Sequence, residues 1–145
     1  MTLIAEFTVV GKQATQGSKR HVGRGILVDS CKELRPWRAA VAAACAEVYR
    51  GPVLRDCAFV LRVRFTRPRP QAHFGSGKNA AKLKPSAPWY WTTKQDLTKL
   101  VRPIEDALTG VVWFDDAQIV EHQTSKVWGP RYETHVAIER LENTR

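Results

Sequence analysis

Cysteine is scarce in this 145-residue chain, and its spacing excludes two common kinds of site. The three cysteines, Cys31, Cys45 and Cys57, are widely separated and form no C-x-x-C pair. A disulfide framework or a zinc site normally needs more cysteines at closer spacing, so the pattern favours a reduced cytosolic chain. No apolar run approaches the roughly 18 residues of a membrane span, and no signal peptide is recognisable. We therefore expect a cytoplasmic protein without a membrane partner.

Acidic residues are also few, with 14 Asp and Glu against 23 Lys and Arg, which gives a formal net charge of +9. A basic excess of this size is typical of proteins that bind nucleic acid, an anionic membrane surface or an acidic partner. The imbalance is greatest at residues 66–95, which hold six Lys or Arg and no acid. This clustering favours a binding surface over a merely soluble basic exterior.

Hydrophobic periodicity predicts an α+β fold with a mixed β-sheet and two main helices, in one domain covering residues 1–145. The predicted strands are residues 3–10, 26–28, 57–65, 117–127 and 132–141. The predicted helices are residues 33–50 and 97–108. The inward face of the first helix is predicted to hold Trp37, Val41, Ala44, Cys45 and Val48. In the strand at 57–65, alternation leaves Arg62 and Arg64 on one wet, basic face.

The strand at 57–65 is followed by a loop that is unusually long for a compact domain. It combines basic side chains, which can neutralise phosphates, with aromatic rings, which can stack on exposed bases. Trp89 and Trp91 are open to a second explanation, in which they fix the loop onto the core. The residues predicted to contact DNA, here and in a basic segment after the first strand, are Lys12, Lys19, Arg20, Arg67, Arg69, Lys78, Lys82, Lys84 and Lys94.

The second predicted helix is amphipathic, and its polar edge carries the candidate chemistry. Thr98, Arg102 and Glu105 follow one another at spacings of four and three, which places them along the same edge. Asp96 stands at or near the N-cap position, where a carboxylate is favoured. Pro103 removes one helical hydrogen bond and clashes with the preceding turn, at a cost of about 3 kcal/mol. We expect the helix to kink there or its regular part to begin close to it.

Hydrolysis of a phosphodiester at neutral pH needs an activated water molecule and relief of the charge on the phosphate. Carboxylates that hold Mg²⁺ or Mn²⁺ supply both, and a nearby basic side chain stabilises the charge that develops. Asp96, Asp115, Asp116 and Arg102 are residues of these types. Taken singly, Asp96 is better explained as a helix cap, and the pair of acids at 115–116 as an exposed turn. Their combination with the basic loop favours a metal site delivered to a phosphate backbone.

Residues 96–120 resemble the RusA family of Holliday junction resolvases. They read DLTKLVR, then DAL, G and DDAQIV, at the spacings of the family pattern D-x-D-[NK]-L-x-[KR], D-A-L, G and D-D-x-Q-V. The match is free of gaps across this segment and looser elsewhere. The resemblance implies a small, dimeric, magnesium-dependent endonuclease of bacteria and their phages, which acts on four-way DNA junctions in recombination and repair.

The resemblance also implies roles for individual residues. Asp96, Asp116 and Arg102 would be catalytic, and Asp96, Asp115 and Asp116 would bind Mg²⁺ or Mn²⁺. The second aspartate of the family pattern falls on Thr98, whose uncharged hydroxyl binds a divalent ion more weakly. The site could therefore be weakened, could recruit Glu105 from the same helix edge, or could be inactive.

Three classes of function remain open at the level of the sequence. The first is a nuclease that makes paired cuts, which predicts a homodimer with the apolar residues 111–114 near the core or the interface. The second is a non-catalytic protein that binds branched nucleic acid, which the threonine at position 98 favours. The third, a structural phage or ribosomal component, explains the charge but not the acids.

Overall fold

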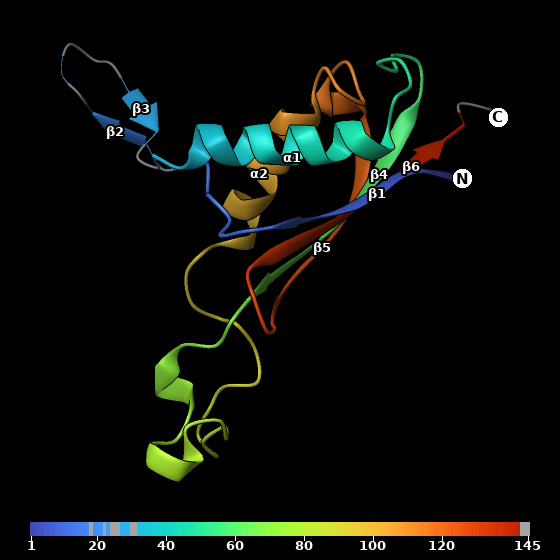
Figure 1. Cartoon of the computed structure of the whole chain (residues 1–145). Helices are drawn as coiled ribbons and strands as arrows, with labels where there is room; N and C mark the ends of the chain where they lie inside the picture. The colour runs from blue at the N-terminus through green and yellow to red at the C-terminus, as the bar shows by residue number, and fades with distance from the viewer. Residues whose placement is uncertain (18, 22, 24–26, 30–31, 143–145) are drawn as a thin grey trace.

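The computed structural model describes residues 1–17, 19–21, 23, 27–29 and 32–142, and for residues 19–21 and 27–29 it describes the backbone alone. The main sheet has four strands in the order β1, β6, β4, β5 (Figure 1). Their bounds are β1 Thr2–Val10, β4 Ala58–Arg67, β5 Ile119–Trp128 and β6 Glu133–Leu141. Strand β6 is antiparallel to both β1 and β4, whereas β4 and β5 are parallel, so the predicted mixed sheet is confirmed.

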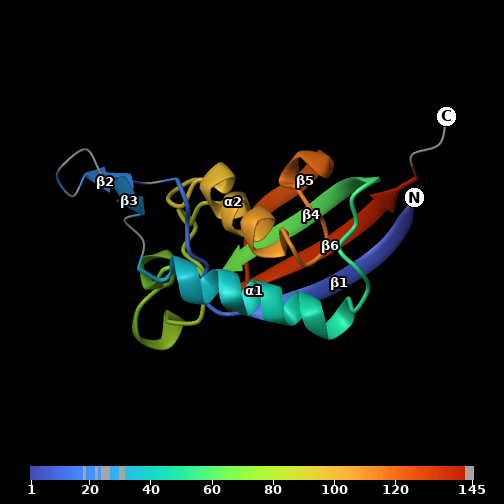
Figure 2. The same cartoon turned by 90° about the horizontal axis from the view of Figure 1, so that it is seen from above.

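Two helices, α1 (Leu34–Val48) and α2 (Leu97–Leu108), lie side by side on one face of the sheet (Figure 2). The core between these layers is formed by side chains that are completely buried, among them Val41, Leu61 and Ile104. This arrangement confirms the α+β class. In the part of the chain that the structure describes, no helix has both the length and the apolar character that crossing a membrane requires.

Local details differ from the sequence-based expectations at several element ends. Val48 is 50% exposed rather than inward-facing, because it is the last residue of α1. The predicted strand at 117–127 begins later, because a 3₁₀ turn, η3 (Asp116–Gln118), precedes β5. Residue 26 of the predicted strand 26–28 lies outside the described residues. The remainder forms β3 (Leu27–Asp29), which pairs with β2 (Lys19–His21) in a separate two-stranded sheet.

Pro103 lies inside α2, which starts at Leu97 and therefore does not begin near the proline. Because proline has no backbone N–H, the Lys99 carbonyl loses its usual partner one turn earlier. The backbone N–H of Gln16 donates to that carbonyl at 3.0 Å. The proline thus creates an acceptor that fixes the segment between β1 and β2 against α2.

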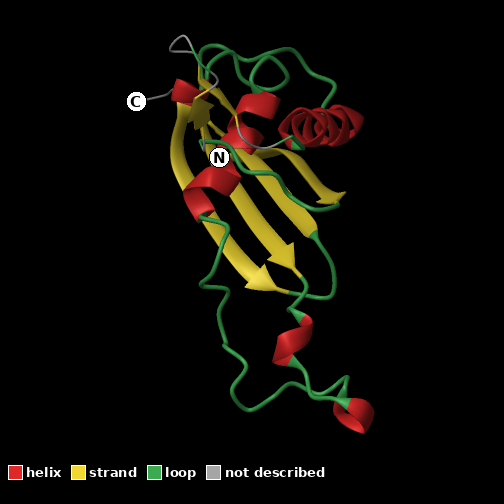
Figure 3. Cartoon of the chain, turned by 90° about the vertical axis from the view of Figure 1, so that its left-hand side faces the viewer, coloured by secondary structure: helices red, strands yellow, loops and turns green. Residues whose placement is uncertain are grey.

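An arm, defined here as residues 68–95, extends from the end of the sheet away from the rest of the domain (Figure 3). It carries two short 3₁₀ turns, η1 (Gln71–His73) and η2 (Gly77–Asn79). At its base Trp91 is only 2% exposed, and its ring stacks on that of Trp128 with centroids 6.0 Å apart. The alternative that an aromatic residue fixes the loop onto the core therefore holds for Trp91.

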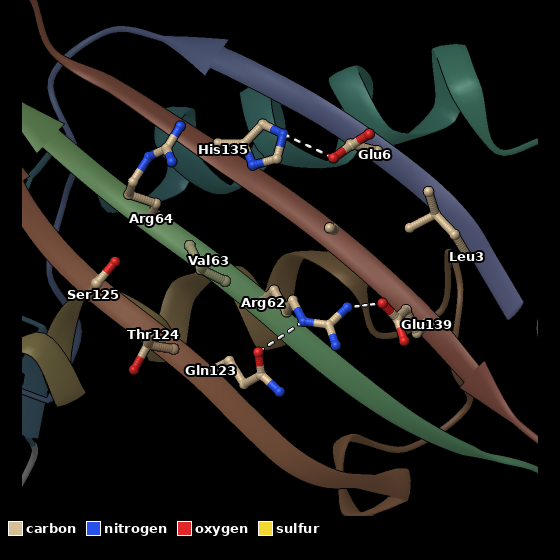
Figure 4. Close-up of a pocket in the computed structure, with 11 residues that line it drawn as sticks. Leu3, Glu6, Arg62, Val63, Arg64, Gln123, Thr124, Ser125, His135 and Glu139 are labelled. Atoms are coloured by element: carbon tan, nitrogen blue, oxygen red, sulfur yellow. Dashed lines mark hydrogen bonds and ion pairs between the residues drawn. The ribbon is translucent and has the colours of Figure 1, made fainter. Parts of the chain in front are cut away.

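The face of the sheet opposite the helices is open and polar (Figure 4). Arg62 and Arg64 lie on it, as the alternation predicted. Arg62 forms an ion pair with Glu139 and donates to the Gln123 side chain at 2.8 Å, while His135 lies 3.2 Å from Glu6. This face is therefore a mixture of paired charges rather than a continuous basic surface.

The apolar residues 111–114, expected near the core or an interface, divide between core and surface. Val112 and Trp113 are completely buried, and the Trp113 ring packs against Phe59 with centroids 5.5 Å apart. Phe114 is 53% exposed and lies beneath the Arg55 guanidinium, 3.8 Å from the ring centroid. Most of this run therefore stabilises the single chain.

Candidate active site

The polar edge of α2 lines a hollow of about 430 Å³. Its lining residues are Gln16, Gly17, Asp96, Thr98, Lys99, Arg102 and Glu105. The common edge of Thr98, Arg102 and Glu105 expected from their spacing is thus present, and Asp96 faces the same space. The segment docked on the Lys99 carbonyl closes one side of the hollow through Gln16 and Gly17.

Asp96 occupies the N-cap position of α2, but its side chain forms no capping hydrogen bond. The carboxylate is 69% exposed, and one oxygen lies 3.9 Å from the Lys99 ammonium. The backbone position therefore agrees with the cap interpretation, whereas the carboxylate does not act as a cap. It is left accessible to a ligand in the hollow.

Glu105 lies where the negative charges of the site are most crowded. Its side chain is 20% exposed, and its carboxylate lies 2.9 Å from His122 Nε2 on β5. Burial raises the pKa of Glu105, the negative charges of Asp116 and Asp106 raise it further, and His122 and Arg102 act against them. The ion pair with Arg102 that helical spacing alone would allow gives way to this contact with β5.

Asp116, the first residue of η3, interacts electrostatically with Glu105. Desolvation raises its pKa first, followed by a side-chain hydrogen bond with Asp115 and the charges of Asp115 and Asp106, while Arg102 lowers it. Arg102 is exposed and forms no hydrogen bond or ion pair with any residue that the structure describes. The Arg102 guanidinium therefore lies near two acids, Glu105 on α2 and Asp116 on η3, without forming an ion pair with either of them.

Asp115 serves the turn rather than the hollow. Its side chain accepts a hydrogen bond from the Ala117 N–H at 2.9 Å and caps η3. Gln118 completes the turn: its side-chain oxygen accepts from the N–H groups of Phe114 and Asp115, both at 3.0 Å. Its amide nitrogen donates to the carbonyls of Leu54, Arg55 and Cys57. Gln118 thus fixes the position of Asp116, a role that its polar character alone did not reveal.

Asp106 is restrained from the opposite side. Gln16 Nε2 donates to its carboxylate at 2.5 Å, and the Arg38 guanidinium of α1 lies 3.7 Å from the same oxygen. These contacts hold Asp106 between the two helices. It contributes negative potential to the site while its own charge is compensated locally.

The carboxylates do not form a compact ligand cage. Among the described residues, no three His, Cys, Asp or Glu side chains are close enough together to hold a metal ion. The donors present are nevertheless the oxygen ligands that Mg²⁺ prefers, and Mg²⁺ commonly uses one or two carboxylates together with water and substrate phosphates. The pKa values of Glu105 and Asp116 are both raised. A bound cation would lower them again, because positive charge favours the ionised carboxylates. The oxygen donors present therefore fit a divalent ion that is bound through one or two carboxylates.

A family model described as endodeoxyribonuclease RusA matches residues 7–139, which is nearly the whole chain. The chain belongs to the RusA endodeoxyribonuclease family. It is also 29% identical over 149 residues to the uncharacterized protein YqaN of Bacillus subtilis (strain 168), across 94% of this chain and 96% of that protein. RusA-family proteins are endonucleases that act on Holliday junctions and in general depend on a divalent metal.

The residues of this RusA-family chain that were predicted to contact DNA, and whose side chains the structure describes, fall into two groups. Arg67 and Arg69 hold the arm together: the Arg67 guanidinium lies 5.3 Å from the Trp91 ring centroid, and Arg69 donates to the Pro88 carbonyl at 2.6 Å. A second group is exposed and has no acidic partner within the described part of the chain. This group is Lys12, Lys78, Lys82, Lys84 and Lys94. Contacts with DNA remain a prediction for both groups, and for Lys19 and Arg20 the structure describes the backbone alone.

Lys126 lies beside the candidate site and was also missed by the sequence-based predictions. From β5 its ammonium donates to the carbonyls of Thr93 and Gln95, each at 2.8 Å, and lies 4.9 Å from the Trp91 ring centroid. Desolvation lowers its pKa, while the nearby Asp96 raises it and Arg67 lowers it. It ties the base of the arm to the sheet just before Asp96. Its neighbours in β5 are Ser125 and Val127, so the local sequence gave no separate signal for it.

Proposed function

We propose that this chain is a structure-specific endodeoxyribonuclease that uses Mg²⁺, or Mn²⁺, to nick four-way DNA junctions as a homodimer. The observation that supports it best is the gathering of Glu105, Asp116 and Arg102 beside the hollow that Asp96 enters, in a chain of the RusA family. The basic arm joins the site directly, since its last residue precedes Asp96. The substrate would be recombination or phage DNA intermediates in the cytoplasm.

The candidate ligands of the divalent ion are Asp96, Glu105 and Asp116, of which one or two would suffice together with water and substrate phosphates. A bound ion supplies an activated water molecule and neutralises charge on the phosphate. Glu105 takes over, in this proposal, the charge that Thr98 does not provide, because it lies on the same edge of α2. Arg102 has no competing partner among the described residues, so it can donate to a phosphate oxygen as negative charge develops there. Asp115 holds the turn that presents Asp116.

A homodimer follows from the chemistry of the substrate rather than from contacts within the chain. A four-way junction with two-fold symmetry offers two equivalent strands, and a symmetric dimer presents two equivalent sites to them. Each chain would contribute one set of Asp96, Glu105, Asp116 and Arg102, so paired nicks would need no second kind of subunit.

A second candidate is a protein that binds branched DNA without cutting it. Two observations favour it: the threonine at position 98, and the lack of three clustered His, Cys, Asp or Glu side chains among the residues described. In this second candidate the basic arm binds DNA, and the acidic residues have no catalytic role. The two candidates differ in whether strand breaks depend on the carboxylates.

The deciding measurement is nicking of a fixed four-way junction over a titration of Mg²⁺ and of Mn²⁺, beside binding in chelator. Asp116→Asn and Glu105→Gln should each lower the nicking rate about 100-fold or more, because each removes a charge that would hold the ion. Binding in chelator should stay equal or tighten, since negative charge facing the phosphates is lost. Thr98→Asp should leave nicking intact or raise it.

The matched control is Glu121→Gln, which removes an exposed carboxylate from β5 without touching the hollow. It should nick at the rate of the unmodified chain. Undiminished nicking by Asp116→Asn would exclude the acids from the mechanism, and junction binding without any metal-dependent nicking would establish the binding protein instead.

A further inference from the structure

Three consecutive aromatic residues, Trp89, Tyr90 and Trp91, lie near the end of the arm and differ in their burial. Trp91 is buried, and its indole Nε1 donates to the Lys94 carbonyl at 2.7 Å. Trp89 is 88% exposed and Tyr90 is 78% exposed. Two adjacent large rings left in water are unusual for a surface without a binding function. The packing explanation that accounts for Trp91 therefore fails for its two neighbours.

The backbone that carries the exposed rings is held on both sides. The carbonyl of Pro88, immediately before Trp89, accepts the 2.6 Å hydrogen bond from Arg69. The Arg69 guanidinium in turn lies over the ring of Trp128, 5.3 Å from its centroid. Immediately after Tyr90, Trp91 is fixed in the stack at the base of the arm. The two exposed rings thus belong to a backbone segment that is held at both ends, which lowers the entropy lost when they bind a partner.

The surroundings of Trp89 point to the chemistry of that partner. A hollow of about 260 Å³ beside it is lined by Arg69, Leu83, Lys84, Pro85, Ala87 and Trp89. Leu83 is 51% exposed, so the hollow offers apolar surface as well as positive charge. No acid occurs anywhere in residues 66–95. A partner that combines flat apolar faces with negative charge fits these features, and nucleobases on their phosphate backbone have both.

We propose that Trp89 and Tyr90 stack on unpaired bases at the branch point of DNA, and that this stacking makes the chain prefer branched DNA to duplex. The inference rests on the proposed function for its substrate, DNA, and adds the means of selection. In a duplex each base face is covered by its neighbours, so the rings gain nothing there. At a branch or in a single strand the faces are free, and stacking adds affinity that does not depend on sequence. Lys78, Lys82 and Lys84 contribute equally to both forms through phosphates.

The test compares affinities for a four-way junction, a duplex with the same number of phosphates, and a dT oligonucleotide, all in chelator. Trp89→Ala combined with Tyr90→Ala should weaken binding to the junction and the oligonucleotide about tenfold or more, the loss expected for stacked bases. Binding to the duplex should change less than about twofold, because phosphate contacts remain. The melting temperature should stay the same, since both side chains are exposed.

Two matched variants make the result specific. Trp89→Phe keeps a stacking ring and should retain the preference for the junction, whereas Leu3→Ala removes an exposed apolar side chain from β1 and should change no affinity. Equal weakening on junction and duplex, unchanged affinity for all three, or a shift from dimer to monomer in sedimentation would each overturn the inference. Because no measurement here involves cleavage, a chain that selects junctions but never nicks them would refute the proposed nuclease and leave this inference standing.

Discussion

At the scale of single residues, the unfavourable position of Glu105 is a measurable property of the site. Its folded-state pKa is raised, chiefly by burial, so the protonated form is favoured in the fold. The contribution of Glu105 to the stability of the fold is therefore fully present at pH values below the ordinary pKa and is lost as the pH rises through the raised pKa. At neutral pH, which lies above the ordinary pKa, ionisation of this carboxyl group therefore works against folding. Carboxylates that destabilise the fold in this way are common in sites that bind a charged ligand.

Glu105→Gln should accordingly raise the melting temperature at pH 7 in chelator, by about 2–4 °C for each kcal/mol of unfavourable charge removed. The gain should shrink as the pH falls towards 4, below the ordinary pKa of the carboxyl group. The loss of the His122 contact works against this gain. Thermal unfolding from pH 4 to 8 measures the effect, with Glu121→Gln as control. A variant less stable than the unmodified chain at pH 7 would contradict this account.

At the scale of elements, local sequence predicted most of the helices and strands but not their partners. Apolar spacing predicted the bounds of α2 directly, and the local patterns predicted β1, β4 and β6 to within two residues at each end, because these signals lie within one segment. The parallel pairing of β4 with β5 and the position of η3 depend on distant residues. The contact of Glu105 with His122 also depends on distant residues, and so does the burial of Trp91 beside an exposed Trp89. Local sequence patterns could not predict these features, because tertiary packing determines them.

Lys126 gives the sharpest test at this scale, because it joins β5 to the base of the arm. Lys126→Met keeps the apolar stem but loses both hydrogen bonds to the Thr93 and Gln95 carbonyls, each worth about 1.5–3 kcal/mol at most when the donor is charged. We expect lower thermal stability and faster amide hydrogen exchange in residues 92–97. Nicking should fall as well, since Asp96 follows directly. Lys32→Met, at an exposed lysine outside the predicted DNA contacts, is the control. Unchanged exchange in this segment would show that Lys126 does not hold the arm.

At the scale of the whole molecule, the net charge of +9 is not spread evenly. The open face of the sheet neutralises its own charges through Arg62 with Glu139 and His135 with Glu6. The arm has no acids with which to do so, and its lysines have no acidic partners within the described residues. The positive potential available to a polyanion is therefore concentrated on the arm, which leads directly to the candidate active site.

This distribution predicts how affinity for DNA depends on salt. Each phosphate neutralised by a lysine releases a counterion, so the slope of log K against log salt should become shallower by about 0.9 for each lysine removed. Lys78→Gln, Lys82→Gln and Lys84→Gln, alone and combined, should show this on junction and duplex alike. Arg50→Gln removes one exposed charge beyond the end of α1 and should leave the slope unchanged. The aromatic variants of the arm should lower affinity without altering the slope, because stacking releases no counterions. Equal slopes for Lys82→Gln and Arg50→Gln would mean that DNA senses only the total charge and that the arm is not its binding surface.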